Sequence, residues 1–245
     1  MIKIKSFASG SSGNCALIYN ENTKLLLDCG IPINNIITNL RKNNILITDI
    51  NSVLLSHAHF DHTHACRELE EWGIEIYSSQ EVINACGLKN AVSIDKTKRI
   101  GFNNNDIDVI PLKVQHGDCE CYAFIFHDKD SLILFATDFM LMEQNLKDFP
   151  FTEIYIETNY NSDIIQKYIE NSDELKRLKY LRQINTHCSV ENAIKYLSNM
   201  DLSRCKKIVG IHLSSGVANK DKIKYAIQNK FGIPTYCLNK KGEEV

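Results

Sequence analysis

The stretch Ser56-His57-Ala58-His59-Phe60-Asp61-His62 places three histidines and an aspartate within six consecutive positions. It follows the apolar run 53–55, which is expected to be a buried strand, and precedes a helix expected over residues 63–72. Imidazole and carboxylate groups are costly to bury together without partners. A metal ion supplies such a partner, and this mixture of nitrogen and oxygen ligands suits zinc, with manganese, iron or cobalt as alternatives.

The spacing within this stretch indicates two groups of ligands. On an extended segment His57 and His59 point to the same side, because side chains alternate along a strand. Asp61 and His62 then lie at the turn into the helix, where they can face a second ion. The alternative is a polar loop in which the histidines occur by chance, and the density of the pattern disfavours it.

The composition is that of an ordinary soluble globular chain. Of the 245 residues, 44% are hydrophobic and 24% are charged, and no apolar run is long enough to span a bilayer. The nine cysteines are odd in number and form no Cys-x-x-Cys pair, which fits reduced thiols in a cytoplasmic protein. We therefore expect a single domain over residues 1–245, with no membrane association.

Charge is distributed unevenly along the chain. Residues 1–163 carry 13 Lys and Arg against 22 Asp and Glu, whereas residues 164–245 carry 15 against 8, which together give the net charge of −2. A basic half beside an acidic, metal-binding half suits an anionic substrate. The alternative reading of the basic cluster is simply the solvated face of a helix; its members are Lys176, Arg177, Lys179 and Arg182.

Further candidate ligands follow strands elsewhere in the chain. Asp28 and Asp138 come directly after apolar strands, and His116 and His212 close two others. Asp28 is expected to orient a metal-binding histidine from behind. Periodicity and turn residues predict strands over 2–7, 15–19, 24–27, 53–55, 74–77, 106–112, 122–126, 131–135, 154–157, 207–211 and 234–238. They predict the other helices over 33–43, 163–170, 173–183 and 221–230, and one that follows Ser189 as its N-cap.

These residues resemble the metallo-β-lactamase fold superfamily. Its ordered motifs match Asp28, the histidine stretch, His116, Asp138 and His212. Within it the chain is most similar to the YycJ-type (WalJ) branch of nucleases and phosphodiesterases. That closer match rests on four stretches, namely 8–14, 156–159, 186–189 and 212–214.

The resemblance implies an α/β fold, a four-layer αββα sandwich with two divalent metal ions at one edge between the sheets. Zinc is the expected metal, and manganese is the alternative. The resemblance assigns one ion to His57, His59 and His116, and the other to Asp61, His62 and His212, with Asp138 between them. Two close cations need a shared anion, and Asp138 can provide it.

This chemistry favours a phosphodiesterase in which a metal-activated hydroxide attacks a phosphodiester of a nucleic acid, either DNA or RNA. Asp61 and His187 are the candidate catalytic residues, and His187 is expected to protonate the leaving oxygen. Candidate substrate contacts are Ser11, Asn159 and Ser189, the last through the N-terminus of its helix.

Three other functions stay open. The runner-up is hydrolysis of small cyclic nucleotides, as by phage enzymes that destroy defence signals. Hydrolysis of esters, thioesters or lactones comes third, and a metal-stabilised binding protein is the non-enzymatic alternative. The apolar stretch 139–151 would cover the site, contact a second subunit in a homodimer, or pack as a core loop.

Overall fold

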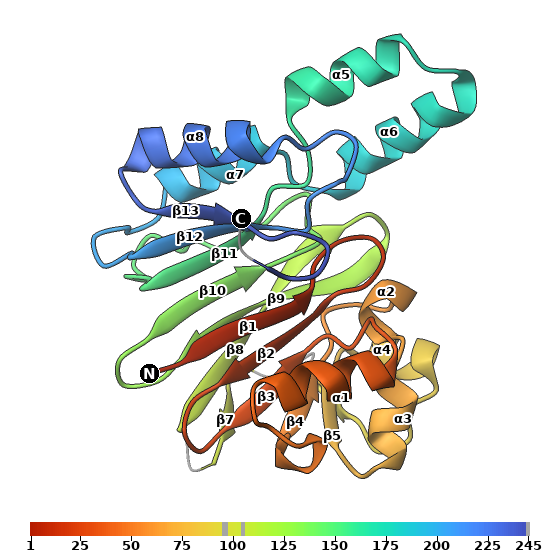
Figure 1. The fold of residues 1–245 in the computed structure, drawn as a ribbon, viewed down its shortest axis with the longest axis vertical. Coiled ribbons are helices and arrows are strands. Elements are labelled where there is room, and N and C mark those ends of the chain that lie inside the picture. The colour runs from red at the N-terminus through yellow and green to blue at the C-terminus, as the bar shows by residue number, and fades with distance from the viewer. Residues whose placement is uncertain (95–97, 104–105, 244–245) are drawn as a thin grey trace.

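Two β-sheets pack face to face in the computed structural model, and helices cover both outer faces (Figure 1). The structure describes residues 1–94, 98–103 and 106–243. The first sheet has the order β1 (Lys3–Ala8), β2 (Cys15–Tyr19), β3 (Lys24–Leu27), β4 (Ser52–Leu54), β5 (Glu75–Ser78) and β6 (Val92–Ser93). The second has the order β13 (Thr235–Cys237), β12 (Lys207–Ile211), β11 (Glu153–Glu157), β10 (Leu132–Ala136), β9 (Cys119–His127), β8 (Ile107–His116) and β7 (Ile100–Phe102).

Helices on the first sheet are α1 (Ile33–Lys42), α3 (Cys66–Glu71) and α4 (Gln80–Cys86), and those on the second are α7 (Val190–Ser198) and α8 (Lys220–Phe231). The short helices η1 (Ile47–Asp49) and α2 (Phe60–Thr63) lie in connections. Helices α5 (Ser162–Glu170) and α6 (Glu174–Thr186) form a hairpin that projects from the sandwich (Figure 1). The predicted αββα architecture is therefore observed.

Successive side chains of a strand face opposite layers of the sandwich. In β3, Leu25 and Leu27 belong to the core between the sheets, whereas Leu26 packs under the helices of the first sheet. In β11, Tyr155 faces the first sheet, while Ile154 and Ile156 face α7 and α8. Strands buried on both faces are therefore continuous apolar runs in the sequence.

The helix expected over 63–72 is interrupted, and this prediction was wrong. The chain instead forms α2 and α3, and the break lies at residues 64 and 65. The backbone N–H of Ala65 donates to the carbonyl of Cys29 at 3.0 Å, which takes it out of a helical hydrogen-bond ladder. This tie holds the histidine stretch against the turn that follows β3.

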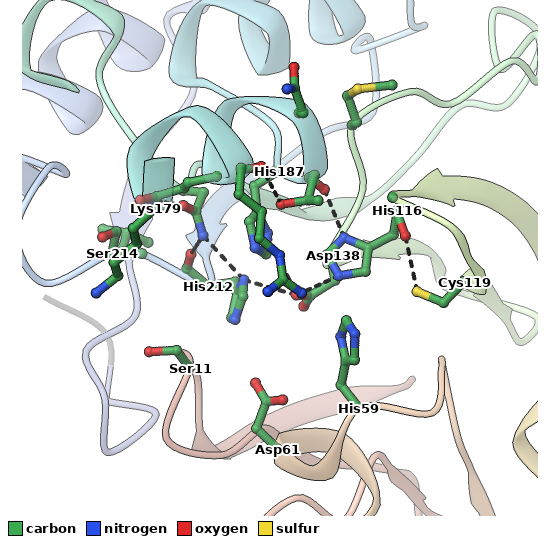
Figure 2. Close-up of a pocket in the computed structure, with 18 of the residues that line it drawn as sticks. Ser11, His59, Asp61, His116, Cys119, Asp138, Lys179, His187, His212 and Ser214 are labelled. Atoms are coloured by element: carbon green, nitrogen blue, oxygen red, sulfur yellow. Dashed lines mark hydrogen bonds and ion pairs between the residues drawn. The ribbon is translucent and has the colours of Figure 1, made fainter. Parts of the chain in front are cut away.

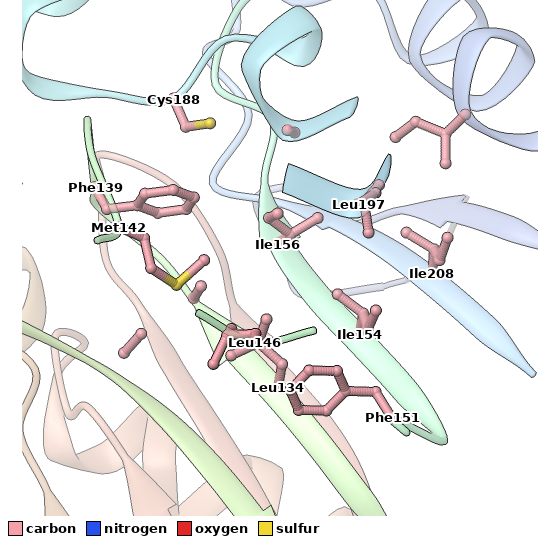
Figure 3. Close-up of a cluster of buried hydrophobic side chains, with 14 of the residues drawn as sticks. Leu134, Phe139, Met142, Leu146, Phe151, Ile154, Ile156, Cys188, Leu197 and Ile208 are labelled. Atoms are coloured by element: carbon pink, nitrogen blue, oxygen red, sulfur yellow. The ribbon is translucent and has the colours of Figure 1, made fainter. Parts of the chain in front are cut away.

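The stretch 139–151 packs as part of the core beneath α7. Phe139 and Phe151 are fully buried, and Met142 and Leu146 nearly so (Figure 3). Among the three roles left open by the sequence, the structure therefore favours the core loop. All nine cysteines are free thiols. Within the described residues, none of the helices is sufficiently long and apolar to cross a membrane.

Candidate metal centre

A cavity of about 1290 Å³ opens at the edge where the strands of both sheets end (Figure 2). Parallel strands β3 and β4 of one sheet, and β10, β11 and β12 of the other, all end at this edge. The predicted site residues that line the cavity are Ser11, His59, Asp61, His116, Asp138, Asn159, His187 and His212. His57 and His62 lie behind this surface and are fully buried.

One group of imidazoles joins the histidine stretch to the second sheet. His57, His59 and His116 each offer a ring nitrogen, and these atoms all lie within 4.8 Å of one another. His57 Nε2 is 2.8 Å from His59 Nδ1, and the rings of His57 and His116 are 4.9 Å apart. This is the group that the resemblance assigned to the first ion.

A second group lies on the other side of Asp138. Asp61, His62 and His212 also offer ligand atoms within 4.8 Å of one another. Asp138 Oδ2 is 3.2 Å from His62 Nε2, and its Oδ1 is 3.3 Å from His212 Nδ1 and 3.9 Å from His116 Nε2. The carboxylate of Asp138 therefore contacts members of both groups, as expected of a shared ligand.

Acceptors behind the imidazoles fix their orientation. His62 Nδ1 donates to Asp28 Oδ2 at 2.7 Å, and His212 Nδ1 donates to Glu157 Oε1 at 2.8 Å. His116 Nδ1 donates to the backbone carbonyl of Thr186 at 2.7 Å. Such bonds fix the ring tautomer and leave Nε2 as the atom that can bind a metal. Asp28 thus makes the contact expected of it.

The donor set fits a divalent metal. His212 Nε2 is buried and has no hydrogen-bond partner among the described residues, which is costly for a polar atom in the interior. The other donors at this edge are imidazole nitrogens and carboxylate oxygens, the ligand types that suit zinc and related ions.

Burial and mutual repulsion keep several imidazoles neutral. Burial lowers the pKa of His57 well below its usual value, and the neighbouring His62 adds to this effect. Burial likewise lowers the pKa values of His59 and His116, against the opposing influence of nearby carboxylates. At Asp138, burial acts against the charged form, but His212 and His62 hold its pKa well below the usual range. Neutral imidazoles and an ionised carboxylate are the protonation states that bind metals, and His57, His59, His116 and Asp138 have pKa directions that favour these states. His62 differs, because Asp28 and Asp138 outweigh burial and raise its pKa well above the usual value.

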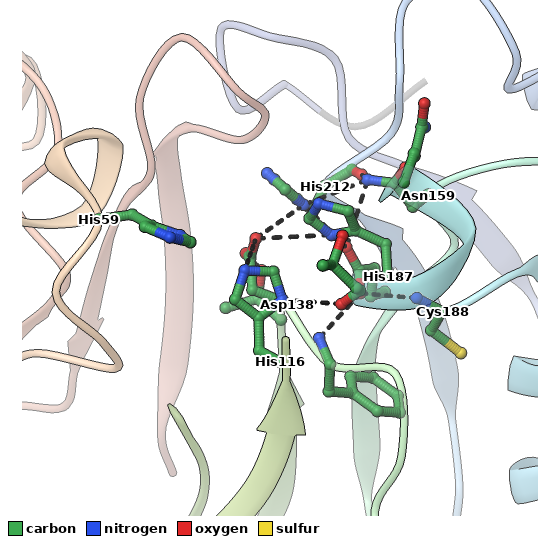
Figure 4. A network of polar contacts seen from close by, with 12 residues as sticks. His59, His116, Asp138, Asn159, His187, Cys188 and His212 are labelled. Atoms are coloured by element: carbon green, nitrogen blue, oxygen red, sulfur yellow. Dashed lines mark hydrogen bonds and ion pairs between the residues drawn. The ribbon is translucent and has the colours of Figure 1, made fainter. Parts of the chain in front are cut away.

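Glu157 is a residue that sequence reasoning missed. It is fully buried at the end of β11, and it accepts hydrogen bonds from His187, His212, and the backbone N–H groups of Phe139 and Cys188 (Figure 4). The sequence did carry a signal, because an acidic residue ends a buried apolar strand here, as Asp28 and Asp138 do. The stretch containing it contributed only to the family resemblance.

His187 lies at the cavity wall beside both groups. Its Nδ1 is 2.8 Å from Glu157 Oε1 and 3.6 Å from Asp138 Oδ1, and its ring lies 4.9 Å from that of His116. Burial disfavours the charged form, but Glu157 outweighs burial and raises the pKa of His187 to about 9. Asp138, Glu157, His187 and His212 form a further group that could hold an ion. Its position thus suits either a proton donor or a metal ligand.

The three predicted substrate contacts occupy different environments. Ser11 is exposed at the cavity mouth (Figure 2). Asn159 lines the cavity but is nearly buried, and its amide group donates to the carbonyl of His212 and accepts from Gln183. Ser189 is buried and does not line the cavity, and its hydroxyl accepts the N–H of Asn192. The structure shows the predicted helix cap at Ser189, and its contact with substrate through the helix N-terminus stays a prediction.

Local backbone geometry directs three of these side chains. Asp28, Asp138 and His212 follow β3, β10 and β12, and all have φ angles between 50° and 57°. This left-handed conformation is uncommon for residues other than glycine and accumulates at functional sites. It turns the chain sharply as each strand ends.

Comparisons with known proteins agree with the predicted relationships. A model of the family "Anti-Pycsar protein Apyc1" matches residues 5–84. The exodeoxyribonuclease WalJ of Streptococcus pneumoniae is 27% identical over 233 residues, covering 86% of this chain and 81% of that protein. The exodeoxyribonuclease YycJ of Bacillus anthracis is 25% identical over 150 residues, covering 57% of this chain and 55% of that protein.

The fold has close counterparts among solved structures. The metallo-β-lactamase fold protein YhfI of Bacillus subtilis superposes with a TM-score of 0.73 over 100% of this chain and 98% of that one, at 15% identity. The chain therefore has the metallo-β-lactamase fold, and its sequence is similar to the WalJ and YycJ proteins, as its motifs predict.

Proposed function

We propose that the protein is a metal-dependent phosphodiesterase that cleaves a phosphodiester bond of a nucleic acid. The observation that carries this proposal is the position of Asp138, whose carboxylate contacts members of both ligand groups in one open cavity. The similarity to proteins named exodeoxyribonucleases over most of the chain supports the same reaction class.

Two divalent ions at such a site lower the pKa of a water molecule and neutralise charge on the phosphoryl oxygens. His57, His59 and His116 would hold one ion, and Asp61, His62 and His212 the other, with Asp138 shared. Imidazole-rich groups favour zinc over manganese.

The protein's own part is to hold these ligands rigid. Asp28 and Glu157 fix the rings of His62 and His212, and the carbonyl of Thr186 fixes that of His116. A ligand held by such a bond loses little freedom when it binds, and losing the bond weakens metal affinity about 10–100-fold.

His187 is the proposed donor of a proton to the leaving oxygen. Glu157 fixes its Nδ1, so Nε2 is the atom presented to the cavity that it lines. The competing role is metal ligand, since His187 also belongs to one of the candidate groups. Metal content measured for His187→Ala separates the two roles. If His187 is the proton donor, the substitution leaves the number of bound ions unchanged. If His187 is a metal ligand, the substitution lowers that number.

The function is tested by hydrolysis of bis-p-nitrophenyl phosphate after reconstitution with zinc or manganese. We expect activity that a chelator removes, and that Asp138→Ala and His59→Ala reduce by at least about 100-fold. His64→Ala is the matched control, since His64 is exposed and lies just beyond the histidine stretch. Full activity in the chelated protein, or in Asp138→Ala, would exclude this mechanism.

A second candidate is hydrolysis of small cyclic nucleotides. The match of the Anti-Pycsar family model to residues 5–84, which include the histidine stretch, favours it. Both substrates share phosphodiester chemistry, so the metal centre suits either one. Turnover of a panel of cyclic mononucleotides, compared with that of end-labelled oligonucleotides, distinguishes the two.

A further inference from the structure

The wall of the cavity opposite the histidine stretch is formed by α6. Lys179 and Arg182 line the cavity from this helix, and Figure 2 shows Lys179 across the cavity from Ser11 and Asp61. Of the described residues that line the cavity, these are the only lysine and arginine. The basic cluster of the sequence is therefore divided, and only two of its members face the candidate metal centre.

Lys179 and Arg182 have no role in packing the core. Helix α6 has no buried residue, and both positions are exposed. Neither forms an ion pair with another residue in the described part of the chain, whereas Lys176 of the same helix pairs with Asp173 at 3.0 Å. Two cations without a carboxylate partner at a cavity wall are available to bind an anion.

The last turns of α6 are tied to the metal centre. The carbonyl of Thr186 accepts the ring N–H of His116, and Gln183 donates to Asn159. The next residue after the helix is His187 itself. Lys179 and Arg182 therefore stand on a support with a fixed position relative to the candidate ligands.

Their spacing lets both side chains reach the same anion. Positions three residues apart lie on one helix face, with Cβ atoms about 5–6 Å apart. The cavity, at about 1290 Å³, also exceeds the usual range of roughly 300–1,000 Å³ for small-molecule sites.

We propose that Lys179 and Arg182 bind a phosphate adjacent to the scissile one, so the preferred substrate is an acyclic nucleic-acid strand. A cyclic mononucleotide has a single phosphate and leaves this subsite without a ligand. The inference rests on the proposed phosphodiesterase function and decides between its two substrate classes. Guanidinium and ammonium groups are the usual protein partners of phosphate.

The test compares two substrates in the metal-replete protein. One is a single-stranded oligothymidylate of about twelve nucleotides, and the other is bis-p-nitrophenyl phosphate, which has one phosphate. In the double variant Lys179→Gln, Arg182→Gln we expect kcat/KM for the oligonucleotide to fall about 10–100-fold more than kcat/KM for the small diester. The larger part of the fall should be in KM.

Salt dependence gives a second readout that a merely structural role would not change. Each phosphate contact contributes about −0.7 to the slope of log affinity against log salt concentration for a single strand. The double variant gives up one neutralised phosphate and should therefore lose about 0.7 of slope for the oligonucleotide. The matched control is Arg204→Gln, because Arg204 is exposed and precedes β12, whereas His212 follows it. This control should behave as the wild type does.

Each outcome has a distinct meaning. Equal losses on both substrates, or an unchanged salt slope, would overturn the subsite. So would a wild-type protein that hydrolyses a cyclic mononucleotide more efficiently than the oligonucleotide. A wild-type protein inactive on every phosphodiester would instead overturn the proposed function.

Discussion

Gly30 offers a sharp test of how the histidine stretch is held. A Cβ added at this position would lie 1.6 Å from the backbone oxygen of Asp61 and 2.7 Å from the backbone nitrogen of His62. Real Cβ atoms do not approach other heavy atoms closer than 3.0 Å, so Gly30→Ala must move the two segments apart by about 1.4 Å. Because the obstacle is backbone, no side-chain rotation can relieve the contact.

The displaced segment carries the candidate ligands. Three backbone hydrogen bonds of 2.8 Å hold this segment in place. Asn14 N donates to the carbonyl of Asp61, Cys29 N donates to the carbonyl of His62, and Gly30 N donates to the carbonyl of Asn14. Overpacking usually costs about 1–3 kcal/mol, and the strain here should fall at the upper end. For a chain of this size, about 3 kcal/mol corresponds to a decrease in Tm of roughly 6–12 °C.

The assay combines urea unfolding of the metal-free protein with metal content after dialysis. We expect Gly30→Ala to unfold at lower urea and to retain less zinc than the wild type. Gly216→Ala is the matched control, since its Cβ would meet nothing within 4 Å and its φ is not positive. It should be neutral or slightly stabilising. Wild-type stability and zinc retention in Gly30→Ala would refute this account of the loop.

Two further substitutions separate the roles of polar residues near the site. Glu157→Gln should weaken metal binding about 10–100-fold, because the neutral amide keeps only one oxygen acceptor, whereas both carboxylate oxygens accept hydrogen bonds in the structure. Isothermal titration with zinc measures this effect, and Glu153→Gln at the other end of β11 should leave zinc affinity unchanged. Ser189→Ala should cost about 1 kcal/mol of stability through the lost cap of α7. Its kcat and KM should be those of the wild type. A raised KM would instead indicate that Ser189 or the N-terminus of α7 contacts the substrate.

The sequence predicted those site residues that can be recognised from their neighbours along the chain. Asp28, Asp138 and His212 could be found because each follows an apolar strand. Helix α4 was not predicted, although the residues that cap its ends, Ser79 and Gly87, are typical sequence signals of a helix start and a helix end. Glu157 differs, because its partners come from the connection between α6 and α7 and from the turns after β10 and β12. Only tertiary packing reveals such a partner set, and the same holds for the direction in which α6 presents its cations.

The three left-handed residues show what holds the ligands in place. Each such conformation costs of order 1–3 kcal/mol, and it persists only where the surroundings enforce it. At two of these residues hydrogen bonds hold the backbone in this conformation. Asp28 N donates to the carbonyl of Leu54 at 2.8 Å, and His212 N donates to Ser9 Oγ at 2.9 Å. Hydrogen bonds between elements of the two sheets therefore position these ligands. A structural metal site is closed, because four protein ligands surround its ion. Here the candidate ligands line an open cavity of about 1290 Å³, which gives a substrate access to them, as catalysis requires.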